Sequence, residues 1–495
     1  MNIDGKTRLI GLIGNPVEHT LSPVIHNGIS RRMEINSVYV PFKVEAEGLE
    51  QAVKGAYELN VLGMNVTVPH KNQVMESLLE IDEAAKQIGA VNTLVRIKDD
   101  KIEQSASGVH NESSDAVALT GYKGYNTDMM GLRRQIHEDG IVLENETVVI
   151  LGAGGAAKAV VYMCLLEGAK KVYLLNRTVS KAQEIAESMN QEFIMPAHCT
   201  EEGQQGKNIH LYESAPVIPM ALADYDSIKE KEFIVFQATS IGLAPNVEDV
   251  VLEDEAFYQK VKVGVDLIYN PANTRFMQLV RKAGGRAYNA LKMLLYQGVI
   301  AYELWHDVKV PQEIIEDIYV DLKRQVYPKD NIVLIGFMGS GKTTVGKAIA
   351  KECNMEFLDT DAYIEQQAGK TIKEIFEEDG EAYFRKLETT VLEQLNATVN
   401  HTVFSTGGGM PLRIENARLL KEIGKVYYLT AANQVIYERV KGDTNRPLLQ
   451  GEDPYGKICR LMKERGPLYE AAADVVIDTN SNDLEEVCSI LKTKI

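Results

Sequence analysis

The stretch IGFMGSGKTT, residues 335–344, fits the pattern G-x-x-x-x-G-K-[ST] and follows a short run of β-branched and apolar residues. Just beyond it, Val345, Ala348 and Ile349 have the i, i+3, i+4 spacing of one helix face. A strand, a glycine-rich loop and a helix in this order predict a P-loop. In such a loop, backbone N–H groups and the helix N-terminus surround bound phosphates.

The chemistry of a P-loop assigns roles to its polar residues. Lys342 is expected to reach the β- and γ-phosphates, and the Thr343 hydroxyl is expected to bind Mg²⁺. Nucleotide contacts are expected from Gly339, Ser340, Gly341, Lys342, Thr343 and Thr344. The region 331–495 is therefore predicted to be a P-loop domain that binds ATP and Mg²⁺.

Two carboxylates end the next apolar run, in FLDTD at 357–361. If the strand continues through them, its alternation puts Asp359 and Asp361 on the same face. At the C-terminal end of a strand opposite a P-loop, they suit Mg²⁺ and a substrate hydroxyl. The alternative is that an aspartate here caps the helix that follows.

Four further motifs follow in a fixed order: FRKLE at 384–388, STGGGM at 405–410, DTNRPLL at 443–449 and KERGPLY at 463–469. Each is weak by itself, because a lone arginine is usually a surface residue and a glycine triplet is usually a turn. Together with the P-loop and the DTD sequence, they closely resemble the shikimate kinase family over essentially all of 331–495.

The resemblance implies a substrate site in this region. Asp361 would hold the shikimate hydroxyl that is phosphorylated and would act as its base. Arg385 and Arg465 would clamp the substrate carboxylate, for which a guanidinium fork is well matched. Gly408 would offer its backbone N–H to the substrate.

The resemblance also implies residues for the nucleotide and the metal. Asp359 would act on the Mg²⁺ side, through water. Arg446 would come from a mobile lid and stabilise the charge of the transferring phosphoryl group. Arg439 would stack on the adenine.

A second glycine-rich loop, LGAGGAAKAV at 151–160, stands between a predicted strand and a predicted helix. Gly152, Gly154 and Ala157 give G-x-G-x-x-A, which is typical of a dinucleotide-binding turn but also arises in ordinary βα units. The next strand ends in Asn176, Arg177 and Thr178, with Lys181 close behind, where NAD enzymes tend to have a carboxylate. Because Arg177 could pair with a 2′-phosphate, the cofactor is predicted to be NADP.

Several motifs surround this loop: GNPVEHTLSPVIHN at 14–27, NVTVPHK at 65–71, GAVNTL at 89–94, GYNTDMMG at 124–131 and QATSIG at 237–242. Taken together with the glycine loop, they resemble the shikimate dehydrogenase family over about 1–310. A departure lies in NALKMLLYQG at 289–298, where Ala290 and Lys292 replace residues that are often glycine or small.

This second resemblance implies that Lys71 and Asp128 are the catalytic pair, which handles the hydroxyl proton during hydride transfer. The implied substrate-binding residues are Thr20, Ser22, Thr67, Asn92, Asp128, Tyr269 and Gln297. Thr239 and Leu267 are implied on the nicotinamide side. With these two, the expected NADP contacts are Gly152, Ala153, Gly154, Gly155, Ala156, Asn176, Arg177, Thr178, Lys181, Thr239 and Leu267.

Alternating β-branched runs and helical segments predict an α/β protein with parallel sheets. We expect a substrate domain at 1–127, a Rossmann NADP domain at 128–288, a linker at 325–330 and a P-loop kinase domain at 331–495. The helices at about 289–324 are expected to pack back on the first domain. The polar tract 99–115 is predicted to be an exposed hairpin tip, and 197–230 an enlarged loop region.

The bulk composition narrows the partners. The chain has 495 residues and a formal net charge of −17, which argues against binding to a nucleic-acid backbone. Its five cysteines are scattered, as in reduced cytosolic proteins, and no signal peptide or membrane span is predicted. We therefore expect a cytoplasmic protein whose partners are small molecules; the sequence leaves its oligomeric state open.

These inferences together predict a bifunctional enzyme of the shikimate pathway to aromatic amino acids. The first half would reduce 3-dehydroshikimate to shikimate with NADPH, and the second would phosphorylate shikimate with MgATP. One alternative is a quinate/shikimate dehydrogenase joined to a kinase of another small hydroxy acid. A second, a regulator without catalysis, is disfavoured because Lys71, Asp128, Lys342, Asp359 and Asp361 are all present.

Overall fold

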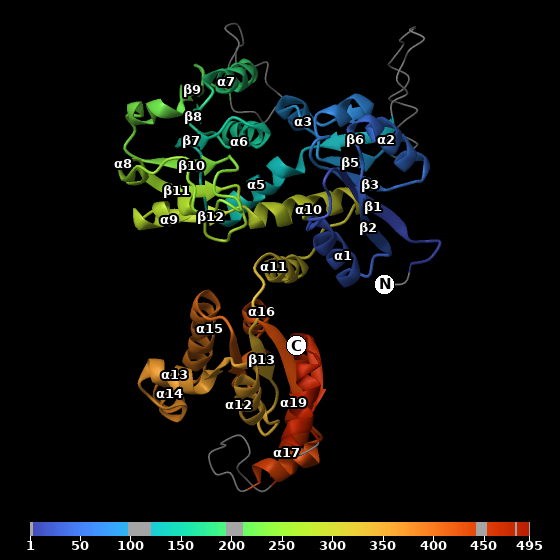
Figure 1. Ribbon diagram of the computed structural model, residues 1–495, viewed down its shortest axis with the longest axis vertical. Coiled ribbons are helices and arrows are strands. Elements are labelled where there is room, and N and C mark those ends of the chain that lie inside the picture. Colours follow the sequence, from blue (N-terminus) through green and yellow to red (C-terminus); the bar gives the residue numbers. More distant parts are fainter. Residues whose placement is uncertain (1–2, 98–119, 195–210, 442–452, 481–482, 495) are drawn as a thin grey trace. The chain divides into compact units, whose positions relative to one another are not determined.

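The computed structural model describes residues 3–97, 120–194, 211–441, 453–480 and 483–494. The chain divides into two units, Met1–Leu322 and Lys323–Ile495. The first unit contains two sheets and the second contains one (Figure 1).

The first sheet of unit 1 has the strand order β2-β1-β3-β5-β6-β4. Its strands are β1 (Arg8–Gly14), β2 (Ser37–Lys43), β3 (Gly63–Val66), β4 (Leu78–Ile81), β5 (Thr93–Arg96) and β6 (Thr120–Tyr125). Its helices are α1 (Ser22–Arg32), α2 (Leu49–Glu58) and α3 (Glu83–Ile88), with short 3-10 turns at Ala46–Gly48 and Gln73–Ser77.

This sheet is mixed, so the expectation of purely parallel sheets is wrong here. β5 pairs antiparallel with both β3 and β6, whereas β1 pairs parallel with β2 and β3, and β4 with β6. The pattern of apolar residues locates a strand but does not fix its direction, which depends on how the connection returns to the sheet. The polar tract 99–115 lies outside the described residues.

The second sheet of unit 1 is wholly parallel, with the order β12-β11-β10-β7-β8-β9. This is the 3-2-1-4-5-6 order of a Rossmann fold. Its strands are β7 (Thr147–Leu151), β8 (Lys171–Asn176), β9 (Val217–Ala221), β10 (Phe233–Gln237), β11 (Val261–Asp266) and β12 (Arg286–Asn289). Its helices are α6 (Gly155–Leu166), α7 (Val179–Phe193), α8 (Glu255–Tyr258) and α9 (Arg275–Lys282).

Strand β9 corrects part of the prediction that 197–230 is a loop region. This strand, with the 3-10 helix Leu222–Ser227 after it, falls inside that range. Pro219 interrupts the pattern of β-formers, and a proline is tolerated because β9 is at the edge of the sheet. The part of the range at 195–210 lies outside the described residues.

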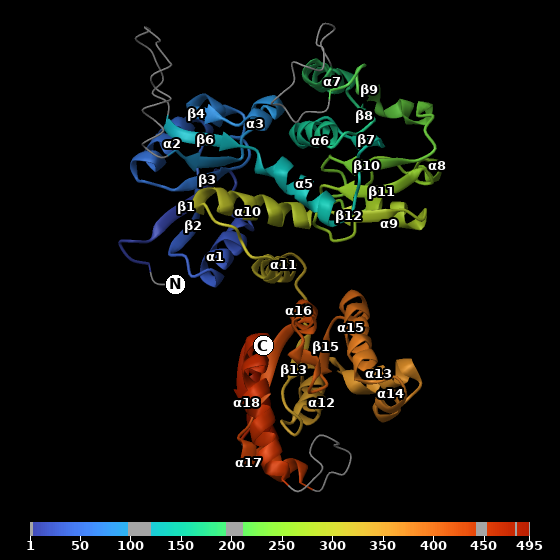
Figure 2. The ribbon, with the colours of Figure 1, turned by 180° about the vertical axis from the view of Figure 1, so that it is seen from behind.

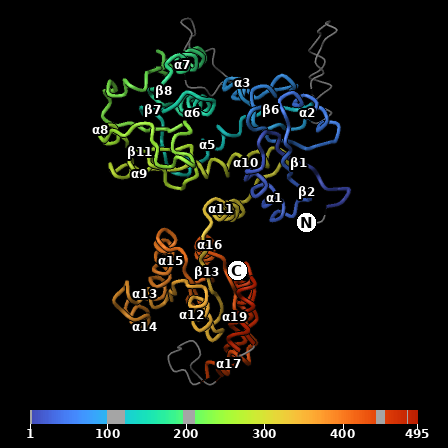
Figure 3. Tube along the Cα trace, viewed as in Figure 1, coloured from blue at the N-terminus to red at the C-terminus, as the bar shows by residue number. Residues whose placement is uncertain are grey.

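Two helices connect the sheets of unit 1. The chain passes from the first sheet to the second through α5 (Thr127–Glu138) and returns through α10 (Leu291–His306). The two helices lie side by side (Figures 2 and 3). After them, α11 (Gln312–Val326) contributes Ile318 and Leu322 to a core shared with β1, β2 and α1.

Helix α11 also extends further than expected. It ends at Val326, so its last turn takes the first two residues of the predicted linker 325–330, and Pro328 follows after the helix has stopped.

Unit 2 is built on a five-stranded parallel sheet with the order β14-β15-β13-β16-β17. The strands are β13 (Ile332–Ile335), β14 (Glu356–Asp359), β15 (Thr402–Ser405), β16 (Lys425–Thr430) and β17 (Val475–Asp478). The helices are α12 (Lys342–Cys353), α13 (Thr360–Ala368), α14 (Ile372–Glu378), α15 (Glu381–Thr398), α16 (Ile414–Ile423), α17 (Asn433–Val440), α18 (Pro454–Ala472) and α19 (Leu484–Lys492).

The central strand β13 is fully buried between two apolar clusters, so it holds the loop that follows it in a fixed place. None of the described helices is both long enough and apolar enough to span a membrane.

Candidate active sites

In unit 1, Lys71 and Asp128 form a close ion pair. The Lys71 Nζ atom lies 2.6 Å from Asp128 Oδ2, and about a quarter to a third of each side chain is exposed. Lys71 follows β3, and Asp128 lies in the first turn of α5, where the Asn126 side chain caps the helix by accepting from Met129 N–H. The fold thus brings together the two residues predicted to be catalytic.

Asn92, a predicted substrate contact, is tied to the same helix end. Its Oδ1 atom accepts hydrogen bonds from the backbone N–H of Thr127 at 2.7 Å and from the Thr127 hydroxyl at 3.1 Å. Backbone bonds also join the Lys71 carbonyl to Val91 N–H. The segments carrying Lys71, Asn92 and Asp128 are therefore bonded to one another.

The other predicted substrate contacts lie on neighbouring segments. Thr20 donates to the Ser22 hydroxyl at 3.2 Å, at the start of α1. Thr67 packs so closely against Gly14 that a Cβ on the glycine would meet its methyl group at 2.2 Å. The Gln297 side chain is buried in α10 and donates to its own helix. Tyr269 follows β11 and is half-buried, which raises the pKa of its hydroxyl.

Beneath these residues lies a buried polar cluster that the sequence interpretation missed. Asn65 Oδ1 accepts from the Tyr39 hydroxyl at 2.8 Å and contacts His26 Nε2 at 3.2 Å. The Asn65 amide donates to Asn92 O and to the Thr93 hydroxyl. Burial lowers the pKa of His26 to about 3, so its ring is uncharged. Asn65 lies in the motif NVTVPHK, so the signal was present but the residue was not singled out.

The predicted NADP residues gather at the C-terminal edge of the parallel sheet. Gly152 follows β7 and has φ +107°, and a Cβ there would meet Thr239 Cγ2 at 2.7 Å, so the loops after β7 and β10 touch. The turn continues through Ala153, Gly154, Gly155 and Ala156, where α6 begins.

This turn fits a dinucleotide. Open space surrounds Gly154 and Gly155 at the N-terminus of α6, as a diphosphate needs. Arg177, Thr178 and Lys181 are exposed just after β8, and Asn176 donates to the Thr178 carbonyl. Leu267 follows strand β11 at the same edge of the sheet.

Lys292, one of the two departures from the family pattern, is occupied by other contacts. Its ammonium group lies 2.6 Å from Asp139 and 2.8 Å from Glu138, at the C-terminal end of α5.

In unit 2, a cavity of about 500 Å³ opens over the P-loop. The lining residues are Met338, Gly339, Ser340, Gly341, Lys342, Thr343, Thr344, Val345, Asp359, Asp361, Ser405, Thr406, Gly408, Arg439, Thr479, Asp483, Leu484 and Val487. Lys342 begins α12, and its ammonium group donates to the carbonyls of Gly336 and Phe337 within the loop.

The two aspartates of DTD both line this cavity, but strand alternation is not the reason. Asp359 ends β14 and caps α13, its Oδ1 atom accepting from the N–H groups of Asp361 and Ala362. Asp361 belongs to the first turn of that helix. The capping alternative thus holds for Asp359, and its other oxygen accepts from the Thr343 hydroxyl at 3.2 Å.

Asp361 has a shifted acidity. Burial, together with the neighbouring negative charge of Asp359, raises its pKa to about 6, although Lys342 and Arg385 act in the opposite direction. A carboxylate with this pKa is ionised at pH 7 and is a better proton acceptor than an ordinary aspartate.

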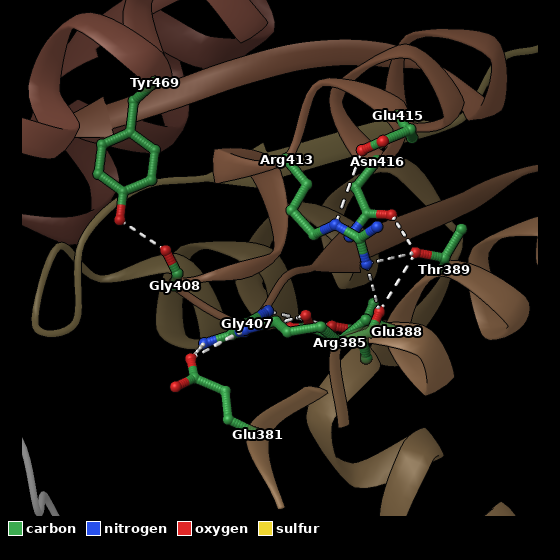
Figure 4. A network of polar contacts seen from close by, with 11 residues as sticks. Glu381, Arg385, Glu388, Thr389, Gly407, Gly408, Arg413, Glu415, Asn416 and Tyr469 are labelled. Atoms are coloured by element: carbon green, nitrogen blue, oxygen red, sulfur yellow. Dashed lines mark hydrogen bonds and ion pairs between the residues drawn. The ribbon is translucent and has the colours of Figure 1, made fainter. Parts of the chain in front are cut away.

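Arg385 lies beside the glycine triplet (Figure 4), and its charge acts on Asp361. Its guanidinium group donates to Glu388, a fully buried residue, at 2.9 Å and to Glu381 at 3.0 Å. A Cβ on Gly407 would meet Asp361 Oδ1 at 2.4 Å, and one on Gly409 would meet Arg385 Nη1 at 2.6 Å. The triplet therefore lets these two charged groups approach the backbone.

The remaining kinase residues surround the same loops. The Tyr469 hydroxyl donates to the Gly408 carbonyl at 2.6 Å (Figure 4). The Arg465 guanidinium lies 6.0 Å from the centroid of the Phe337 ring. Arg439 donates to the carbonyls of Thr479 and Gly339. Arg446 lies outside the described residues.

The proposed metal ligands are few but suitable. Among the described residues, no group of three or more His, Cys, Asp or Glu side chains could hold a metal ion. Mg²⁺ is commonly bound by one or two protein oxygens together with nucleotide phosphates and water. Thr343 and Asp359, in contact beside the P-loop, fit that arrangement.

Models of known families match the first unit in three places: the shikimate dehydrogenase substrate binding domain over 12–94, shikimate / quinate 5-dehydrogenase over 133–204, and the shikimate 5′-dehydrogenase C-terminal domain over 291–318. A shikimate dehydrogenase (NADP(+)) of Methanopyrus kandleri is 36% identical over 322 residues, which are 65% of this chain and 98% of that protein. The chain belongs to the shikimate dehydrogenase family.

A similar enzyme of Desulforamulus reducens is 36% identical over 317 residues, covering 64% of this chain and 96% of its own length. Among solved structures, a shikimate dehydrogenase in complex with NADP⁺ has a TM-score of 0.51 and 33% identity, over 65% of this chain and 97% of its own. A chorismate mutase/shikimate 5-dehydrogenase fusion protein from Clostridium acetobutylicum has a TM-score of 0.51 and 28% identity. The match covers 65% of this chain and 98% of the fusion protein's chain.

The second unit matches another family. The shikimate kinase model covers residues 338–495. The chain is thus a fusion of a shikimate dehydrogenase with a shikimate kinase domain. Both family resemblances inferred from the sequence are confirmed, as is the α/β fold class with a Rossmann and a P-loop part.

Proposed function

We propose that this chain catalyses two consecutive reactions. The first unit reduces 3-dehydroshikimate to shikimate with NADPH, and the second phosphorylates shikimate with MgATP to give shikimate 3-phosphate. The proposal is supported most directly by the Lys71–Asp128 pair, which stands at 2.6 Å in a dehydrogenase whose relatives are named for NADP(+). It also includes the division into a substrate domain at 1–127, a Rossmann domain at 128–288 and a kinase domain at 331–495.

In the reduction, bound NADPH supplies the hydride to the substrate carbonyl carbon. As negative charge develops on the carbonyl oxygen, Lys71 donates the proton that turns it into a hydroxyl. Asp128 holds the ammonium group in place. Thr20, Ser22, Thr67, Asn92, Tyr269 and Gln297 orient the ring.

In the phosphorylation, Asp361 accepts the proton of the attacking hydroxyl, and its raised pKa suits it to that role. Arg385 and Arg465 bind the substrate carboxylate, with Gly408 beside them. Lys342 and Arg446 would stabilise charge on the transferring phosphoryl group, and Thr343 and Asp359 would hold the metal. Arg439, which lines the cavity over the P-loop, would face the adenine.

The test is a coupled assay on the full chain with 3-dehydroshikimate, NADPH and ATP. NADPH consumption is followed at its absorbance band and shikimate 3-phosphate by mass spectrometry. We expect Lys71→Ala to abolish the first reaction only, and Lys342→Ala the second only. If either variant retains the reaction that it should lose, that residue assignment is wrong.

The same preparation tests the substrate range. Initial rates with shikimate against quinate, and with NADP⁺ against NAD⁺, separate the proposed activity from a quinate dehydrogenase. A preference for quinate and NAD⁺ would contradict the proposal.

A further inference from the structure

A carboxylate that the proposed reactions do not use is buried at the end of β11. Asp266 is fully buried, and the groups that donate hydrogen bonds to its carboxylate in the described structure are all neutral. Its Oδ2 atom accepts from the Thr274 hydroxyl at 2.6 Å. Its Oδ1 atom accepts from Ile268 N–H at 3.0 Å and from the Gln237 amide at 3.3 Å. A buried carboxylate held only by neutral donors is costly, so its presence calls for a reason.

Gln237 carries the network to the neighbouring strand. It ends β10, is also fully buried, and pairs in register with Asp266. Its side-chain oxygen accepts from both the backbone N–H and the hydroxyl of Thr239, at 2.6 and 2.7 Å. Its amide group also donates to the Ile241 carbonyl at 3.1 Å. One glutamine side chain therefore fixes the course of the chain after β10.

The two side chains join two loops. The loop after β10 carries Thr239, which packs on Gly152 of the dinucleotide turn. The loop after β11 carries Leu267 and Tyr269, and it is closed by the bond from Thr274 to Asp266. Both loops leave the same edge of the sheet, where β10 and β11 lie side by side (Figure 1).

We propose that Asp266 is a positioning residue of the dehydrogenase, acting through Gln237 and Thr274. It holds the loops that carry Thr239, Leu267 and Tyr269 in the arrangement that receives the nicotinamide end of the cofactor. This inference rests on the proposed reductase function.

The geometry explains why the residue is an aspartate. Both carboxylate oxygens accept hydrogen bonds, Oδ2 from Thr274 and Oδ1 from Ile268 and Gln237, so both oxygens must be acceptors. An asparagine of the same shape would place its NH₂ group against the donors on one of these two sides, which leaves a buried donor without an acceptor. Burial raises the pKa of Asp266 to about 6, so the ionised group opposes folding at pH 7, which argues that it is retained for position.

The experiment compares four variants of the full chain. Asp266→Asn and Thr274→Val break the network, and Thr274→Ser keeps the hydroxyl. Val149→Ala removes two methyl groups from the buried strand β7 of the same sheet and controls for loss of stability alone. Shikimate phosphorylation by each preparation controls for folding of the second unit.

We expect Asp266→Asn and Thr274→Val to raise KM for NADPH about tenfold, a size typical of losing a hydrogen bond to a charged group. In Thr274→Ser, KM for NADPH should stay within about twofold of the wild-type value. Val149→Ala should also keep KM within about twofold of the wild-type value, but it should lower the melting temperature. Equal KM changes in Val149→Ala and Asp266→Asn would overturn the inference, because stability alone would then explain them.

A second readout needs no cofactor. In the unliganded chain, we expect amide hydrogen exchange at Thr239, Ile241 and Ile268 to be at least about tenfold faster in Asp266→Asn than in the wild type. Unchanged exchange at these amides would overturn the inference whether or not the chain reduces dehydroshikimate. A wild type that does not reduce it, but whose loops exchange faster in Asp266→Asn, would refute the proposed function and leave the ordering role of Asp266 supported.

Discussion

The Lys71 ammonium group donates to the Asp128 carboxylate across 2.6 Å, although β4, α3, β5 and β6 lie between the two residues along the chain. Asp128 stands in the first turn of a capped helix, and Lys71 is held by a backbone bond from Val91 to its carbonyl. The pair is therefore positioned by rigid neighbours on both sides. A proton donor held in this way can meet a substrate oxygen with little further ordering.

Asp128→Asn tests whether the negative charge at this position is needed, because asparagine has nearly the same shape as aspartate. The amide can still accept from Lys71, but it lacks the negative charge of the carboxylate beside the ammonium group. We expect kcat for dehydroshikimate reduction to fall by about 10²–10⁴. The control is Glu138→Gln at the other end of α5, which should stay within about threefold. Full reductase activity in Asp128→Asn would remove this residue from the mechanism.

The kinase should show an acid limb set by Asp361, whose pKa is raised to about 6. Only the ionised carboxylate can accept the hydroxyl proton. The value of kcat/KM for shikimate should therefore be level above pH 7 and fall about tenfold per pH unit below about pH 6. Rates measured from pH 5 to 8 test this, and a profile level down to pH 5 would contradict it.

The same shift predicts an effect on stability. Because the pKa of Asp361 is raised in the folded chain, the protonated form is favoured there. Protonated Asp361 therefore stabilises the folded state fully below about pH 3.8, and this stabilisation is lost as pH rises through about 6. Asp361→Asn should therefore raise the melting temperature of the second unit at pH 7.5 and have little effect near pH 4. Scanning calorimetry at both pH values would show whether the sign is right.

Arg177 should decide the choice of cofactor. It is exposed just after β8, where a Rossmann fold places the residue that faces the ribose. We expect Arg177→Ala to raise KM for NADPH by about 10- to 100-fold, the size of a lost charge-assisted hydrogen bond, and to leave KM for NADH unchanged. Lys170→Ala, just before the opposite end of the same strand, is the matched control. An equal loss for both cofactors would argue against a phosphate contact.

Tyr469 should matter for shikimate but not for ATP. Its hydroxyl, whose pKa burial raises to about 12, stays protonated and donates to the carbonyl of Gly408. In Tyr469→Phe the ring still packs on Tyr428, but Gly408 loses its tether. We expect KM for shikimate to rise about three- to tenfold with KM for ATP constant. Tyr383→Phe, at an exposed position, should change neither value; a rise in both would indicate general loosening instead.

The sequence identified most of the framework because its signals are local. The strands at 8–14, 171–176 and 332–335 follow from short apolar runs between turn residues. The P-loop and the dinucleotide turn were predicted from glycines whose spacing lets the backbone turn tightly and approach a phosphate. The direction of β5 and the edge strand β9 were not predicted, because strand direction and edge pairing depend on contacts between distant segments.

The arrangement of side chains was predicted less completely, for the same reason. Asp359 and Asp361 were expected on one face of a strand, but β14 stops at Asp359 because that residue caps the next helix. Asp266 and Gln237 end two neighbouring strands, yet nothing in the sequence pattern says that they bond to each other. Such buried networks become visible only when both strands are in place.

The crossing of α5 and α10 has a mechanical meaning. A Cβ on Gly131 would meet the backbone of Gln297 at 2.7 Å and that of Met293 at 2.8 Å, so the two helices touch main chain to main chain at this point. Gly131 is one turn from Asp128, and Gln297 is a proposed substrate contact. In the part of the chain that the structure describes, these two helices carry the chain between the sheets of the first unit. A movement of one sheet against the other would therefore displace this contact, and with it the positions of residues proposed to bind the substrate.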